Sequence, residues 1–172
     1  QEIERYFRDA EGRVVIVESA ADLEEALAAE AQFTVIAYST LIHNGVVDRL
    51  LQVPFDSLIW DECQYAATVT GSGLETAHEQ EELQGSQRAI ACCRLVDGIQ
   101  FQRILALSAT PWQNHPKEMA AIAHALRRDL FPTVGAFHQS RPTDARFLRE
   151  LFAENVVEVD LDEVLDLPPM TP

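Results

Sequence analysis

The chain has 172 residues, 47% of them apolar and 8% aromatic, which is enough to bury the core of one globular domain. Its 13 Lys and Arg against 28 Asp and Glu give a net charge of −15, which opposes tight nucleic-acid binding by the chain alone. The sequence has no signal segment and no apolar run of the ~18–20 residues that a membrane span needs, so we expect an intracellular protein without membrane contact, in the cytoplasm or nucleoid, or in the nucleus of a eukaryote.

The first half of the chain alternates helix and strand patterns. We expect, in order, a helix, a strand, a helix, a strand, a helix and a strand over residues 1–8, 14–17, 19–30, 33–38, 46–51 and 57–61. Ser19 and Asp22 have the spacing of an N-cap and its acidic partner. Strands separated by helical crossovers predict an α/β fold, a parallel β-sheet flanked by helices.

The second half begins with a small, flexible segment and a run of glutamates over residues 68–84, which favours a solvated helix face or loop over a recognition role. Ser86 is the expected N-cap of a helix that Gly98 closes. Beyond it we expect a strand at 102–110, helices from Pro116 and from about Thr143, and a half-exposed strand at 157–161.

The three cysteines, Cys63, Cys92 and Cys93, are odd in number and contain no CxxC pair. They indicate neither a disulfide framework nor a zinc finger, and they favour a reducing compartment. Cys92 and Cys93 lie in a predicted helix, where burial as small apolar side chains is favoured over metal binding.

The third predicted strand ends in two adjacent carboxylates, Asp61 and Glu62. Ligands of α/β domains bind beyond the carboxyl ends of the strands, so the pair is placed at a site. Phosphoryl transfer from a nucleotide needs a divalent ion and a positioned water, and adjacent carboxylates can serve both. We therefore expect Asp61 to hold Mg²⁺ through water and Glu62 to orient the attacking water. An apolar run followed by Asp-Glu also occurs as a solvated acid pair that merely ends a strand.

A second motif follows the strand at 102–110. The run Ser108-Ala109-Thr110-Pro111-Trp112-Gln113-Asn114 resembles motif III of superfamily 2 helicases and, more narrowly, of the Swi/Snf-related ATPases, which are duplex-DNA translocases and chromatin-remodelling motors. Asp61-Glu62-Cys63-Gln64 resembles their motif II. Residues 1–7, 33–41 and 166–169 resemble the helix after motif Ia, the strand before motif II and the Leu-Pro-Pro near the end of the first lobe.

The resemblance implies a RecA-like P-loop NTPase lobe that is incomplete at its N-terminus. Residues 1–166 would be the C-terminal part of lobe 1, and residues 167–172 the start of a linker. The implied cofactors are ATP and Mg²⁺, and the implied partners are duplex DNA and a second RecA-like lobe.

The resemblance also implies a role for each motif residue. Asp61 and Glu62 would serve the Mg²⁺ and the hydrolytic water, and Gln64 would contact the phosphate side of the nucleotide or motif III. Ser108, Ala109 and Thr110 would couple the nucleotide state to lobe closure and DNA grip. The two hydroxyls also have a simpler possible role as caps of the turn after the strand.

One part of such a site is missing from the sequence. There is no GxxxxGK[ST] loop, and the only lysine, Lys117, follows motif III. The P-loop is therefore expected upstream or is absent, and the chain alone should be inactive. Two alternatives stay open: a non-catalytic acidic interaction module derived from a degenerate motor lobe, and a metal hydrolase that uses Asp61, Glu62 and a histidine, although the five histidines form no HxH or HxxxH pair.

Overall fold

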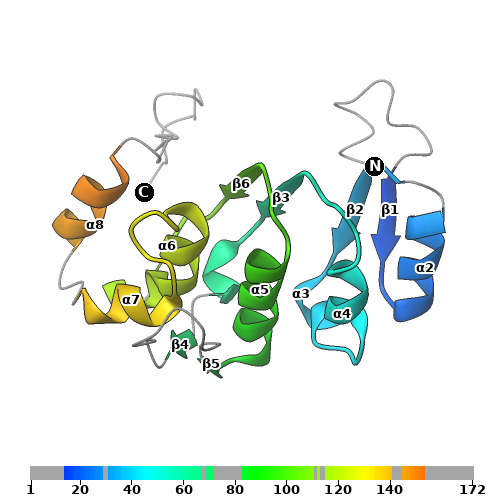
Figure 1. Cartoon of the computed structure of the whole chain (residues 1–172), viewed down its shortest axis with the longest axis horizontal. Helices are drawn as coiled ribbons and strands as arrows, with labels where there is room; N and C mark the ends of the chain where they lie inside the picture. The colour runs from blue at the N-terminus through cyan, green and yellow to red at the C-terminus, as the bar shows by residue number, and fades with distance from the viewer. Residues whose placement is uncertain are drawn as a thin grey trace, which may run out of the picture.

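The computed structural model describes residues 14–28, 31–66, 69–71, 83–110, 112, 115–140 and 145–153. Over these ranges the chain is mixed α/β, with small parallel sheets flanked by helices (Figure 1). The helix predicted at 1–8, the strand predicted at 157–161 and the linker at 167–172 lie outside the described residues. No helix in the described part of the chain is long and apolar enough to cross a membrane.

The first parallel pair joins β1 (Val14–Val17) and β2 (Phe33–Ile36), with α2 (Ala20–Ala28) between them in the sequence. The predicted capping pair is confirmed: the Ser19 N–H donates to the Asp22 carboxylate at 2.7 Å, and the Asp22 N–H donates to the Ser19 hydroxyl at 3.3 Å. The start of α2 is therefore fixed by residues within one turn of each other.

The strand predicted at 33–38 is shorter than expected. Tyr38 already begins α3 (Tyr38–Leu41), and α4 (Val46–Leu50) follows where a short helix was predicted. The chain therefore turns away from β2 before it reaches the third strand.

The second parallel pair joins β3 (Ser57–Trp60) and β6 (Arg103–Ala106), with α5 (Gln87–Gly98) between them in the sequence. The Ser86 hydroxyl accepts a hydrogen bond from the Ala89 N–H at 3.2 Å, which confirms the predicted N-cap of α5. β6 ends at Ala106, so the strand predicted at 102–110 is also shorter than expected.

The prediction of one continuous parallel sheet is wrong in the described residues. β1 pairs with β2 and β3 with β6, and the two pairs lie side by side without a shared ladder (Figure 1). Each of these strands has only four residues, so few ladder bonds are available between neighbours. The fold class, α/β with parallel strands flanked by helices, is confirmed at that coarser level.

The parallel strands bury one face and expose the other. Val17 and Trp60 are 1% and 4% exposed, whereas Ile16 and Ile59 beside them are 62% and 58% exposed. The register places Ile16 beside Val35 and Ile59 beside Leu105, so each strand pair exposes two neighbouring apolar side chains. Parallel sheets are normally covered on both faces.

Two features were not predicted. β4 (Val69–Gly71) and β5 (Leu83–Gly85) form an antiparallel pair at either end of the acidic stretch, so residues 83–84 are strand and not the solvated helix face or loop expected there. α7 (Val134–Gln139) begins after Thr133, whose hydroxyl accepts a hydrogen bond from the Ala136 N–H at 3.1 Å. A 3₁₀ turn (Pro116–Met119) leads into α6 (Ala120–Leu126). The last described helix is α8 (Ala145–Phe152).

Gly98 ends α5 in a different way from the one predicted. It is the last residue of the helix, and it is absent from the glycines with a positive φ, so it is not a left-handed cap. A Cβ added to Gly98 would lie 2.3 Å from Cδ2 of Leu51. The glycine is therefore needed for the close approach of α5 to the residue that follows α4.

Candidate functional site

The two predicted motifs come together at the carboxyl ends of β3 and β6. Their pairing continues past the strands: the Leu107 N–H donates to the Trp60 carbonyl at 2.7 Å, and the Cys63 N–H donates to the Leu107 carbonyl at 2.9 Å. Asp61 and Glu62 therefore lie in the turn that immediately precedes Cys63, opposite the segment that carries Ser108.

A chain of side-chain hydrogen bonds joins the two motifs. The Ser108 hydroxyl donates to Oε1 of Gln64 at 2.6 Å, and Nε2 of Gln64 donates to Oε2 of Glu62 at 2.6 Å. Gln64 thus uses both ends of its amide, one toward each motif. Gln64 was expected to contact either the phosphate side of a nucleotide or motif III, and in the structure it contacts Ser108.

Ser108 has a second bond. Its hydroxyl oxygen accepts a hydrogen bond from the Thr110 N–H at 3.0 Å, so it also holds the turn after β6. The predicted capping role therefore applies to Ser108 in addition to its contact with Gln64. Ala109 and Thr110 are exposed, and among the described residues no side-chain hydrogen bond links them to Asp61 or Glu62.

Glu62 has an unusual backbone conformation. Its φ is +50°, and it is the only non-glycine residue with a positive φ in the described part of the chain. A left-handed conformation at a residue with a Cβ costs about 1–2 kcal/mol. The next residues form a 3₁₀ turn, Cys63–Ala66, in which Cys63 and Ala66 are 2% and 0% exposed. The buried turn therefore anchors a strained residue whose carboxylate remains exposed.

Tyr38 follows β2 at the edge where the strand ends were predicted to be functional, but its contact with the acid pair was not predicted. Its hydroxyl donates to the backbone carbonyl of Asp61 at 2.8 Å, across 23 positions of sequence. Its ring lies 5.9 Å from the ring of Tyr65.

Burial and nearby negative charge suppress ionisation around the acid pair. Burial first, and then the charges of groups that include Asp61 and Glu62, raise the pKa of the Tyr38 hydroxyl. Burial, together with the same two carboxylates, raises the pKa of the Cys63 thiol to about 11. Tyr38 therefore remains a hydrogen-bond donor to Asp61, and Cys63 remains a neutral thiol within the core.

Asp61 and Glu62 fit the ligand preferences of Mg²⁺. Oδ1 of Asp61 accepts the Glu62 N–H at 3.1 Å, which leaves its other carboxylate oxygen for an ion or its water shell. Mg²⁺ is commonly held by one or two carboxylates, with waters and substrate phosphates as its other ligands. No group of three or more His, Cys, Asp or Glu side chains suited to a metal occurs in the described residues, so a protein-only cage is not formed there.

Three histidines form hydrogen bonds with other parts of the fold. Nδ1 of His115 accepts from the Lys117 N–H at 3.0 Å, a ring nitrogen of His138 lies 3.1 Å from the Val69 carbonyl, and His124 bridges Phe131 and Asp97. None of these contacts involves Asp61 or Glu62.

Comparison with known proteins adds no assignment. No family model matches the chain. No curated protein matches it.

Proposed function

We propose that the chain is the C-terminal part of the first RecA-like lobe of a Swi/Snf-related, ATP-dependent DNA translocase. The observation that carries the proposal is the path of hydrogen bonds from Glu62 through Gln64 to Ser108, because it joins two motifs that lie 44 residues apart in the sequence. A hydrolytic carboxylate linked to a neighbouring strand end can pass a change at the nucleotide to the rest of the lobe.

Each side chain at the edge has a distinct task in this proposal. Bound Mg²⁺ and ATP would supply the phosphoryl group and neutralise its developing charge. Asp61 would hold the ion through its water shell, and Glu62 would accept a hydrogen bond from the attacking water. Gln64 restrains the Glu62 carboxylate through a hydrogen bond. Ser108 is bonded both to Gln64 and to the Thr110 N–H, so a movement of Glu62 would be passed to the turn that contains Thr110.

The exposed apolar face supports an incomplete lobe. Ile16 lies beside Val35 in one parallel strand pair and Ile59 beside Leu105 in the other, and all four side chains are exposed on a face that α/β domains normally cover with helices. In the proposed parent protein, upstream residues that include the P-loop cover this face, and duplex DNA binds across this lobe and a second RecA-like lobe.

The test uses the intact protein that contains these residues. Duplex DNA should stimulate its ATP hydrolysis, and Glu62→Gln should abolish turnover while nucleotide binding persists. Glu25→Gln, which changes an exposed carboxylate on α2, is the matched control and should leave turnover unchanged. Unchanged turnover in Glu62→Gln would remove Glu62 from its assigned role, and ATP hydrolysis by the 172 residues alone would contradict the need for a P-loop.

The same exposed face favours a second candidate, a non-catalytic acidic interaction module. Exposed apolar side chains on a chain with a net charge of −15 suit a basic, apolar protein partner. The two candidates differ upstream of residue 1. A Gly-Lys-Ser or Gly-Lys-Thr loop on a strand there supports the motor, and a reading frame without one supports the module.

A further inference from the structure

The peptide unit between Asp61 and Glu62 is held at both of its ends. Its carbonyl, on Asp61, accepts a hydrogen bond from the Tyr38 hydroxyl at 2.8 Å. Its N–H, on Glu62, donates to Oδ1 of Asp61 at 3.1 Å. A peptide unit is planar, so two bonds at opposite ends fix the orientation of the whole plane. The orientation of this plane sets the φ angle of Glu62.

The next peptide unit is held in the same way. Its carbonyl, on Glu62, accepts a hydrogen bond from the Tyr65 N–H at 3.0 Å, and its N–H, on Cys63, donates to the Leu107 carbonyl at 2.9 Å. Glu62 therefore lies between two peptide planes of fixed orientation, which together determine both of its backbone angles. The resulting φ of +50° is disfavoured for a residue with a Cβ, so it persists only because these bonds hold it.

The bond from Tyr38 differs from the other three in its origin. Asp61 and Tyr65 lie within three residues of Glu62, and Leu107 contributes a backbone carbonyl, which any residue at that position would supply. Tyr38 instead contributes a side-chain hydroxyl from 23 positions away. The conformation of Glu62 therefore depends on the residue type at position 38.

Tyr38 is itself well placed to fix the acid pair. Its ring is partly buried against the core and lies 5.9 Å from the ring of Tyr65. Because Tyr38 begins α3 directly after β2, its bond to Asp61 crosses from the first parallel strand pair to the end of the second. The two strand pairs share no ladder, so this bond ties the acid pair to the first of them.

The conformation of Glu62 decides where its carboxylate lies. Backbone angles set the direction of the Cα–Cβ bond and restrict the rotamers that follow it. Nε2 of Gln64 donates to Oε2 of Glu62 at 2.6 Å, and Oε1 accepts no hydrogen bond from a described residue. Oε1 is thus the oxygen left for the attacking water in the proposed reaction.

We propose that Tyr38 is a positioning residue for hydrolysis: its hydroxyl fixes the peptide plane between Asp61 and Glu62 and thereby directs the Glu62 carboxylate at the attacking water. Its role in turnover rests on the function proposed above. Its hold on the backbone of Glu62 does not, and the two parts are tested separately.

The first test measures the conformation at position 62 in the 172-residue chain, without ATP. With Tyr38 present, the equilibrium constant for unfolding should be about fivefold smaller for Glu62→Gly than for Glu62→Ala, because alanine retains the left-handed strain. In a Tyr38→Phe background the peptide plane is free to turn, so the difference should fall below about twofold. Phenylalanine keeps the ring and removes only the hydroxyl, and each unfolding transition shows that the variant is folded.

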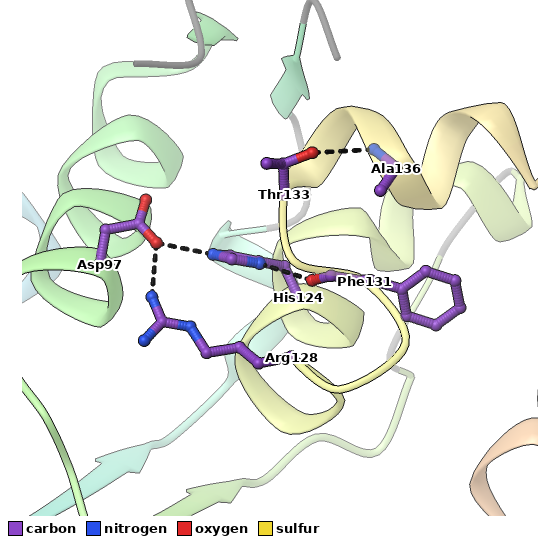
Figure 2. Close-up of polar contacts among 6 residues, drawn as sticks. All are labelled: Asp97, His124, Arg128, Phe131, Thr133 and Ala136. Carbon is purple, nitrogen blue, oxygen red and sulfur yellow. Dashed lines mark hydrogen bonds and ion pairs between the residues drawn. The ribbon is translucent and has the colours of Figure 1, made fainter. Parts of the chain in front are cut away.

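Two control backgrounds separate this effect from a general loss of a hydroxyl. Tyr65→Phe removes the hydroxyl of the neighbouring ring, which is 55% exposed and forms no hydrogen bond to a described residue through that group. Thr133→Ala removes a hydroxyl that accepts the Ala136 N–H at the start of α7. Figure 2 shows this bond together with the hydrogen-bonded cluster of Asp97, His124 and Arg128. Both backgrounds should keep the full difference between glycine and alanine at position 62.

The second test measures kcat and KM for ATP in the intact protein that contains these residues. kcat is expressed per nucleotide-binding site, so unfolded protein does not count. Tyr38→Phe should lower kcat by about tenfold or more and change KM by less than about twofold, because the hydroxyl positions Glu62 and does not touch the nucleotide. Tyr65→Phe and Thr133→Ala should leave both parameters unchanged, although Thr133→Ala lowers stability.

Two results would overturn the proposal. One is a difference between glycine and alanine at position 62 that persists in the Tyr38→Phe chain. The other is full kcat in Tyr38→Phe while Glu62→Gln is inactive. Turnover in Glu62→Gln would instead overturn the proposed function, and a difference at position 62 that is lost only in Tyr38→Phe would still support the hold of the hydroxyl on Glu62.

Discussion

The Ser108 hydroxyl donates to the Gln64 amide oxygen at 2.6 Å and thereby joins the ends of two adjacent parallel strands. Gln64 is only partly exposed, so its amide competes with less water than a surface group would. The bond lies between the two motifs on which the proposed function rests, and its strength can be measured directly.

A double-mutant cycle measures this bond. Gln64→Ala and Ser108→Ala should each lower the free energy of unfolding, and their effects should be non-additive by about 1 kcal/mol, the usual net worth of a partly buried hydrogen bond. Denaturant unfolding of the 172-residue chain measures the change in the free energy of unfolding for each single variant and for the double variant. Thr133→Ala, which removes the N-cap of α7 elsewhere in the fold, is the control partner and should be additive with Gln64→Ala. Additivity in the Gln64 and Ser108 pair would mean that the contact contributes nothing to stability.

Features set by neighbours in the sequence were predictable, and features set by distant packing were not. Ser19 and Asp22 lie within one helical turn, so their residue types alone predicted the start of α2. The meeting of Gln64 with Ser108 was predictable because both follow parallel strands and the resemblance pairs their motifs. The contact of Tyr38 with Asp61 was not predicted, because it depends on where α3 turns the chain.

The sheet and the acidic stretch show the same limit. Periodicity predicts that residues are extended, but it does not predict which strands share a ladder, so the split between β2 and β3 was not visible. β4 and β5 have three residues each and no apolar alternation, so only their pairing identifies them as strands. Gly98 was predicted as a turn residue, whereas its small size matters because of Leu51, 47 residues away.

Gly98→Ala tests that close approach. The new methyl group would lie 2.3 Å from Cδ2 of Leu51, so Leu51 must move and packing is lost. We expect a loss of about 1 kcal/mol or more in the free energy of unfolding, despite the better helix propensity of alanine. In a Leu51→Ala background the clash is absent, and the same Gly98→Ala change should become neutral or stabilising by up to about 1 kcal/mol. Equal effects in both backgrounds would exclude the contact as the reason for glycine.

Asp97 predicts an acid-sensitive contribution to stability. The pKa of Asp97 is lower in the folded chain than its usual 3.8, so the folded state favours the ionised form. This stability is fully present above about pH 5 and is lost as the pH falls through the folded-state pKa. Asp97→Asn should reduce the free energy of unfolding at neutral pH and flatten its fall below about pH 4, as seen in urea titrations at several pH values.

The control for this experiment is Asp48→Asn, which removes an exposed carboxylate paired with Arg94 on another helix. It separates the general effect of one fewer negative charge from the particular contacts of Asp97 with His124 and Arg128. An acid dependence in Asp97→Asn as steep as that of the unmodified chain would show that the cluster does not supply the effect.

At position 62, the variant with glycine should be more stable than the variant with alanine. Glu62→Ala and Glu62→Gly both lose the bond from Gln64, so their difference reports mainly the backbone. At a φ of +50° alanine retains the left-handed strain and glycine does not, so Glu62→Gly should be about 1 kcal/mol more stable than Glu62→Ala. At Glu25, in the exposed interior of α2, the order should reverse by about 1 kcal/mol. The same order at both positions would mean that Glu62 is not held in a left-handed conformation. In the intact protein both Glu62 variants should lack ATP hydrolysis, since the strained residue is kept for its carboxylate and not for stability.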